Sequence, residues 1–312
     1  MSFTVVPLHN LSLSAGTRAK FGNGLIFQDV PQWVKDEPIL KDLSRHDRQS
    51  VLDAKRALVA EYDAPSIGHP DPSWQGKQPK AIQEVKFEAA ILANFALWLR
   101  QPSTVCFTVG FHALSRTIPG ESEKKPIILR IQSETTLFCH PNDFQNVVTT
   151  AHVVKAGKLH VVLSSIPRKN SVWEALRSCW AALTSYPPDH RYPLFWMALE
   201  SLFGADDVSE IGYKLAQRIA FFLADNPADA RDLFRKVKTC YKMRSTIIHG
   251  RWKDDSKIDA VMADTEGIVR TVFRRLLDDA EMLRTFISKD RNEFLEDWVF
   301  SRSTDPPPYS KP

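Results

Sequence analysis

Two side chains suited to phosphate binding and proton transfer, Arg244 and His249, lie five residues apart. A guanidinium stays charged and presents a fork of N–H donors, whereas an imidazole titrates near neutral pH. The arginine falls in an apolar seam of helical spacing, formed by Leu233, Val237, Cys240 and Ile247. A charge there is costly unless it meets a carboxylate, a phosphate or a partner subunit. Gly250 suits the end of a helix, which places the imidazole at an edge.

The segment around this pair is strongly basic. Residues 233–253 contain no acidic residue and carry the cations Arg235, Lys236, Lys238, Lys242, Arg244, Arg251 and Lys253. Such a concentrated patch suits a phosphate backbone, although the whole chain has a formal charge of only +4. Tyr241, Ser245 and His249 are spaced four residues apart, so their polar groups share one stripe of a helix. Tyr241 and Trp252 are the aromatic residues of the segment that we expect to contact a base.

Residues 241–250, Tyr-Lys-Met-Arg-Ser-Thr-Ile-Ile-His-Gly, resemble the signature of the HEPN superfamily, in which an arginine is followed a few residues later by a histidine. The resemblance is strongest to the Apea-like HEPN branch. Residues 198–203, Ala-Leu-Glu-Ser-Leu-Phe, and residues 213–220, Tyr-Lys-Leu-Ala-Gln-Arg-Ile-Ala, occur in the order that this branch shows. Three ordered segments are more specific than one spacing alone. The similarity extends over residues 172–287.

The resemblance implies an endoribonuclease that cleaves RNA without a metal or a cofactor and leaves a cyclic phosphate. Such proteins act in antiviral (anti-phage) defence or in toxin-like growth arrest, and two signatures face each other across a homodimer. His249 would then transfer protons, Arg244 would stabilise charge on the phosphate, and Ser245 would orient either group. The RNA itself would contact Lys238, Tyr241, Lys242, Arg251 and Lys253.

Two other functions fit the same residues. In the first, the helical domain is a HEPN module that binds RNA or a partner protein, or dimerises, without catalysis. In the second, the helical domain only dimerises and the first domain carries the activity. No nucleophile triad, glycine-rich phosphate loop or carboxylate cluster in residues 1–168 supports this last reading.

Structural roles are also open for the charged residues. Arg244 can pair with Glu200, the acidic residue of a mostly apolar helix over 194–203. Arg218 lies in a second apolar seam and competes for that glutamate, so we predict a structural ion pair between Glu200 and Arg218. His249 can also be a helix-terminal histidine that the negative end of the helix dipole attracts.

Length and composition predict two domains in the cytoplasm. The chain has 312 residues, 43% of them hydrophobic, which is enough for two cores. Its four cysteines are widely spaced, as expected of reduced thiols, and the chain shows neither a membrane-spanning stretch nor a secretory signal. The four histidine and cysteine positions 139, 140, 152 and 160 lack regular metal-ligand spacing.

Proline usage and periodicity divide the chain into three parts. Residues 1–168 are predicted as an α+β domain, which would sense a trigger or regulatory partner, restrain the nuclease or select the RNA. Its predicted helices are 47–62 and 81–99, and its small sheet uses strands near 105–109, 127–131 and 159–163. Residues 169–302 are predicted as an all-α bundle and residues 303–312 as a flexible tail. The bundle helices are predicted over 171–184, 194–202, 209–224, 228–249 and 263–287.

Overall fold

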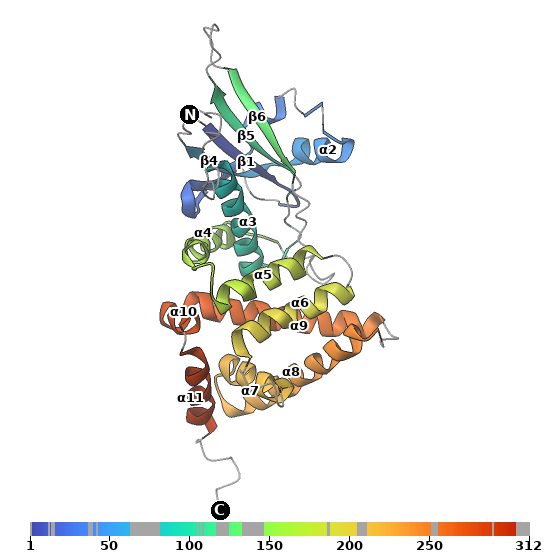
Figure 1. Cartoon of the computed structure of the whole chain (residues 1–312). Helices are drawn as coiled ribbons and strands as arrows, with labels where there is room; N and C mark the ends of the chain where they lie inside the picture. The colour runs from blue at the N-terminus through green and yellow to red at the C-terminus, as the bar shows by residue number, and fades with distance from the viewer. Residues whose placement is uncertain are drawn as a thin grey trace, which may run out of the picture. The chain divides into compact units, whose positions relative to one another are not determined.

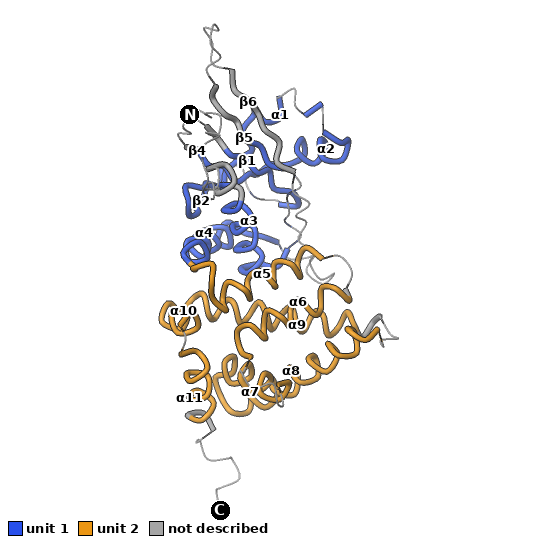
Figure 2. Tube along the Cα trace, viewed as in Figure 1, with its two compact units in different colours: residues 1–165 blue, residues 166–312 orange. Residues whose placement is uncertain are grey.

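The structure of the protein is a computed structural model in which helices predominate and an antiparallel sheet lies near the N-terminus (Figure 1). It describes residues 2–11, 13, 16–36, 40–41, 43–62, 82–103, 105, 107, 109–116, 125–132, 147–185, 188–204, 211–250, 255–288 and 290–303. The chain forms two compact units, residues 1–165 and 166–312 (Figure 2). The boundary predicted at 168 therefore falls close to the division between the units.

Unit 1 is built around a six-stranded sheet with the strand order β2-β3-β4-β1-β5-β6. Every paired neighbour is antiparallel. The strands are β1 (Ser2–Leu8), β2 (Ala19–Lys20), β3 (Leu25–Asp29), β4 (Arg56–Tyr62), β5 (Val109–Arg116) and β6 (Lys125–Gln132). The α+β character predicted for this part of the chain is confirmed.

Helices cover both faces of this sheet. On one face, Val5, Val59 and Phe111 lie side by side in register and pack with residues of α1 (Gln32–Asp36) and α2 (Arg45–Asp53). Successive residues of a strand point to opposite faces, so the buried Val6 and Leu58 face the other way. On that side α3 (Ile82–Arg100) packs against β1 and β3, and α4 (Thr150–Ser165) packs against α3 and β2.

Two predicted elements of unit 1 are wrong. The helix predicted over 47–62 ends at Asp53, and residues 56–62 form β4. This strand has helices on both sides and buries Ala57, Leu58, Val59 and Ala60 in succession, so it lacks the alternation that marks a half-exposed strand.

The strand predicted near 159–163 is part of helix α4. Its buried residues Val153, Ala156, Leu159 and Leu163 recur at helical spacing, and Val161, which completed the apparent alternation, is 55% exposed. The strand predicted near 105–109 begins only at Val109. The predicted helix 81–99 and the strand near 127–131 are confirmed as α3 and β6.

Unit 2 is a bundle of helices. Its described helices are α5 (Ser171–Thr184), α6 (Pro188–Phe203), α7 (Ile211–Leu223), α8 (Pro227–Ile248), α9 (Asp255–Asp278), α10 (Ala280–Ile287) and α11 (Arg291–Ser303). The helix predicted over 263–287 is interrupted because the Asp279 side chain accepts hydrogen bonds from two backbone N–H groups and starts α10. Helix α11 was not predicted, and its Phe294 and Trp298 pack on the aromatic core at Phe286 and Phe222.

Buried polar contacts hold α6, α8 and α9 together. The Tyr192 hydroxyl donates to the Cys240 carbonyl at 2.6 Å, and burial raises the pKa of this phenol. Arg191 and Glu266 form an ion pair at 2.6 Å with both side chains less than 10% exposed. Because an unpaired buried charge is strongly destabilising, the ion pair holds α9 against α6, while the Tyr192 hydrogen bond holds α8 against α6. Among the helices that the structure describes, none has both the length and the apolar character to span a bilayer.

Candidate functional site

Helix α8 has capping residues at both ends. The Asn226 side chain accepts from the Asp229 N–H at 3.0 Å, and Pro227 occupies the first turn, where its missing N–H costs nothing. The helix ends at Ile248, with His249 as the C-terminal cap. Gly250 follows with φ of +63°, a conformation that other residues adopt only with strain. The predicted end of the helix at this glycine is confirmed.

Arg244 lies half-buried between α8 and α6. Its guanidinium donates to the Glu200 carboxylate at 3.3 Å, and the side chains are 27% and 23% exposed. The Tyr241 hydroxyl donates to the other Glu200 oxygen at 3.2 Å, and the guanidinium carbon lies 5.7 Å from the centre of the tyrosine ring. Arg244 Nε is buried with no hydrogen-bond partner among the described residues. The cation is thus anchored by one carboxylate, and its side chain remains 27% exposed beside that contact.

The predicted ion pair between Glu200 and Arg218 is wrong. Arg218 donates to the carbonyls of Phe203 and Gly204 at the end of α6, at 3.1 and 3.2 Å. It also pairs at 3.4 Å with Glu296 of α11, the helix that was not predicted. Glu200 is left to Arg244, the alternative partner that the sequence had suggested.

His249 and Ser245 are exposed one turn apart at the end of α8. Within the described residues, neither side chain takes part in a hydrogen bond or ion pair, so both remain accessible to a ligand. Positions five apart on an α-helix are rotated by about 140° around its axis. Arg244 accordingly points toward α6, whereas His249 lies with Ser245 on the exposed side of α8. No direct contact between Arg244 and His249 is present among the described residues.

Tyr241 is a packed residue rather than a free aromatic surface. Its ring meets Trp196 edge to face at 5.0 Å, and a Cβ atom at Gly212 would lie only 2.8 Å from the ring. Burial, followed by the nearby Glu200 charge, raises the pKa of its hydroxyl. These contacts fit a residue that positions Glu200 and Arg244 better than the predicted base contact.

Ion pairs neutralise part of the predicted basic patch. Arg235 lies 3.7 Å from the Asp232 carboxylate, and Lys236 lies 2.5 Å from the Asp264 carboxylate of α9. Lys238 and Lys242 are exposed and make no ion pair with the described residues. The remaining predicted positions, Arg251, Trp252 and Lys253, lie outside the residues that the structure describes.

An exposed aromatic residue on α7 was missed by the sequence analysis. Tyr213 is 49% exposed, and its ring meets Phe234 of α8 at 5.2 Å. The ammonium group of Lys238 lies 6.0 Å and 5.8 Å from the centres of the two rings. Helical periodicity gives no signal for this cluster, because its members come from two helices.

The cysteines and the possible metal ligands among the described residues do not form a second candidate site. Cys179 and Cys240 are buried free thiols, and burial raises the pKa of each above its ordinary value, which disfavours the reactive thiolate. Among the described residues, no three His, Cys, Asp or Glu side chains are grouped so that they could hold a metal ion.

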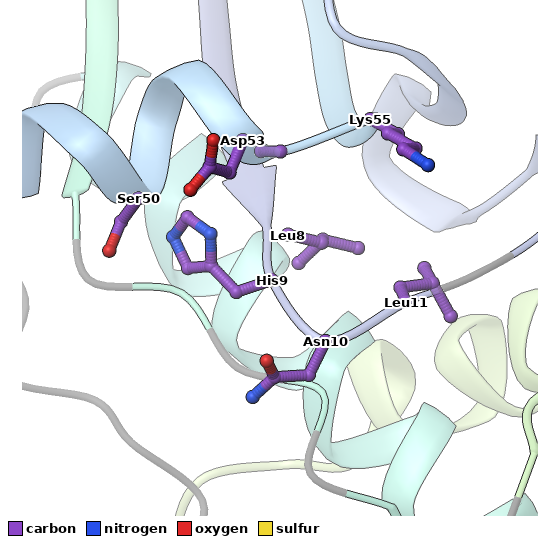
Figure 3. A pocket seen from close by; sticks show the side chains of 8 residues that line it. Leu8, His9, Asn10, Leu11, Ser50, Asp53 and Lys55 are labelled. Atoms are coloured by element: carbon purple, nitrogen blue, oxygen red, sulfur yellow. The ribbon is translucent and has the colours of Figure 1, made fainter.

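Unit 1 contains a hollow of its own at the ends of β1 and α2 (Figure 3). Its volume is about 360 Å³, and it is lined by Leu8, His9, Asn10, Leu11, Ser50, Asp53, Ala54 and Lys55. The His9 ring lies next to Ser50 and Asp53 of α2 in this view. Burial, followed by the nearby His46, lowers the pKa of His9, so its ring is neutral at pH 7. No residue of this hollow was predicted as a site.

Comparison of the chain with protein-family models, with curated proteins and with solved structures finds no match. The resemblance of residues 241–250 to the HEPN signature therefore remains an expectation from the sequence.

Proposed function

We propose that the protein is a metal-independent endoribonuclease of the HEPN type, acting in anti-phage defence or toxin-like growth arrest. The observation that carries this proposal is the position of a guanidinium and an imidazole in the last two turns of α8. Arg244 is anchored by Glu200 with its side chain still 27% exposed, and His249 is exposed five residues beyond it. Unpaired Lys238 and Lys242 on the exposed side of the same helix would attract the phosphate backbone.

The cleavage moves two protons. One leaves the ribose 2′-hydroxyl as its oxygen forms a bond to phosphorus, and the bond from phosphorus to the 5′-oxygen breaks as that oxygen takes up the other. The products are a 2′,3′-cyclic phosphate and a 5′-hydroxyl end. His249 serves as base or acid, and Arg244 stabilises the charge on the phosphorus oxygens.

A homodimer would supply what one chain lacks. One imidazole cannot easily act as base and acid in the same step, and Arg244 and His249 of one chain point in different directions around α8. A second copy related by a two-fold axis would bring a second imidazole and guanidinium to the same phosphate. In this proposal unit 1 senses a trigger, restrains the site or selects the RNA.

A non-catalytic RNA-binding module is the second candidate. The favouring observation is the Glu200–Arg244 ion pair, since an arginine already compensated by a carboxylate can serve structure alone. In that case the exposed lysines would hold RNA and His249 would be a helix cap that the helix dipole stabilises.

Cleavage of a labelled single-stranded RNA by the full chain and by His249→Ala decides between the two. We expect the variant to lose about 100-fold or more in cleavage rate while its affinity for RNA changes little. His190→Ala is the matched control, because His190 is an exposed histidine on α6. The wild-type products should carry cyclic phosphate ends, also in the presence of a chelator. RNA that is bound but stays intact under every activating condition, including expression during phage infection, would favour the binding module.

A further inference from the structure

Tyr213, Phe234 and Lys238 form an aromatic and cationic cluster on the surface of unit 2, which we call the α7–α8 platform. Helices α7 and α8 pack side by side, and the two rings meet at 5.2 Å with an angle of 71° between their planes. The edge contact supports the Tyr213 ring from one side. About half of the tyrosine surface, 49%, nevertheless remains open to solvent.

Packing between α7 and α8 explains the position of Phe234 but not the exposed surface of the Tyr213 ring. Tyr241 gives the contrast within the same bundle, because its hydroxyl is bonded to Glu200 and its ring is enclosed by Trp196 and Gly212. A ring held by a neighbouring helix loses little rotational freedom when a ligand stacks on it, so the Tyr213–Phe234 ring pair is in place before binding. A flat aromatic surface beside a cation suits a nucleobase joined to a phosphate.

The platform is aligned with the proposed cleavage site. Phe234, Lys238, Ser245 and His249 lie four, seven and four positions apart, so they share one stripe of α8, in which Phe234 is partly buried and the other three are exposed. Lys238 and His249 are separated by about 16 Å along the helix, at about 1.5 Å per residue. A strand with a stacked rise of about 3.4 Å per nucleotide covers this distance in about five nucleotides, and an extended strand needs fewer. The unpaired Lys242 lies between the two ends.

We propose that the α7–α8 platform is a base-stacking subsite for single-stranded RNA, binding a nucleotide about three to six positions from the phosphate held at His249. This inference rests on the proposed function for the nature of the ligand. A base stacks on Tyr213, and Lys238 moves from the rings to the adjacent phosphate. Because every base presents a flat face, the subsite selects for length and single-strandedness rather than for sequence.

The test compares RNA of two lengths on the full chain. Affinities of a fluorescent 10-nucleotide single-stranded RNA and of a dinucleotide are measured for the wild type, Tyr213→Leu and Tyr213→Phe. Leucine keeps an apolar side chain but removes the ring, so we expect roughly 5- to 100-fold weaker binding of the longer RNA. Dinucleotide binding should stay within about twofold, and the phenylalanine variant should bind both RNAs as the wild type does. Phe300→Leu on α11 is the control, because Phe300 is a 69% exposed aromatic outside the stripe.

The outcomes separate the subsite from the nuclease. If Tyr213→Leu weakens binding of the longer RNA while His249→Ala leaves the cleavage rate unchanged, the subsite is supported and the proposed chemistry fails. Equal affinity of Tyr213→Leu and wild type for the 10-nucleotide RNA overturns the subsite, even where cleavage depends on His249. Failure of the wild type to bind the longer RNA, or an equal loss with Phe300→Leu, overturns it as well. Unchanged circular dichroism and thermal unfolding of the variants show that the helices are intact.

Discussion

Acidification should destabilise unit 1 through His160. This histidine of α4 is fully buried, and its Nε2 lies 2.8 Å from the Ala89 carbonyl of α3. That contact requires the proton on Nε2, which leaves Nδ1 as a bare nitrogen, buried and without a hydrogen-bond partner among the described residues. A Cβ atom at Gly22 would lie 3.0 Å from Nδ1, so the space beside it is small. Protonation would place an unpaired charge there.

The size of the effect follows from the pKa. Burial lowers the pKa of His160 from 6.5 to about 4, opposed only in part by the bond to Ala89. Because the folded-state pKa is the lower one, the unfolded chain takes up the proton first as the pH falls. Stability from the neutral imidazole is therefore complete above pH 6.5 and is lost between pH 6.5 and 4. At about 1.36 kcal/mol per pKa unit the full loss is about 3 kcal/mol, of which about 2 kcal/mol is lost by pH 5.

Urea unfolding at pH 7 and pH 5, read by pulsed hydrogen exchange in peptides from α3 and α4, measures this loss in unit 1 alone. His160→Gln keeps an N–H donor for Ala89 but cannot be protonated, so its unfolding free energy should fall by about 2 kcal/mol less than that of the wild type. His190→Gln, at an exposed position in unit 2, should follow the wild type. An equal pH dependence in wild type and His160→Gln would refute the reasoning.

Two further predictions concern the packing that supports each unit. A Cβ atom at Gly157 of α4 would collide with the Lys20 carbonyl of β2, so Gly157→Ala should destabilise unit 1 by about 1–3 kcal/mol in urea unfolding. A Cβ atom at Gly267 of α9 would have no neighbouring atom within 4 Å, so Gly267→Ala should stabilise unit 2 by about 0.5–1 kcal/mol. A similar loss of unfolding free energy in both variants would contradict the argument. Glu200→Gln should destabilise unit 2 by about 1 kcal/mol, a small loss because the ion pair with Arg244 is partly exposed. The double variant with Arg244→Met should recover part of this loss. Additive effects in that cycle would show that the pair is not coupled.

Several features of this protein could be predicted from the sequence because their causes are local. Helix α5 has the predicted bounds, and α8 ends at Gly250 as predicted. Periodicity and the backbone freedom of glycine act within one or two turns, so neighbouring residues carry the signal. The exposed Ser245 and His249 also follow from the helical register of α8.

Tertiary structure decided the features that depend on what lies opposite a residue. β4 was misassigned because it is buried on both faces and so lacks the alternation of a half-exposed strand. α4 was misassigned because it packs against a second helix, and its apolar residues gave the appearance of strand alternation. The partner of Glu200 was decided by the packing of α6 on α8 and by Glu296 on α11, which took up Arg218. Tyr213 joins Phe234 only because α7 and α8 pack together. Whether a residue is paired or exposed depends on two surfaces in contact. The order of residues in one segment describes only the first of these surfaces and not the surface opposite.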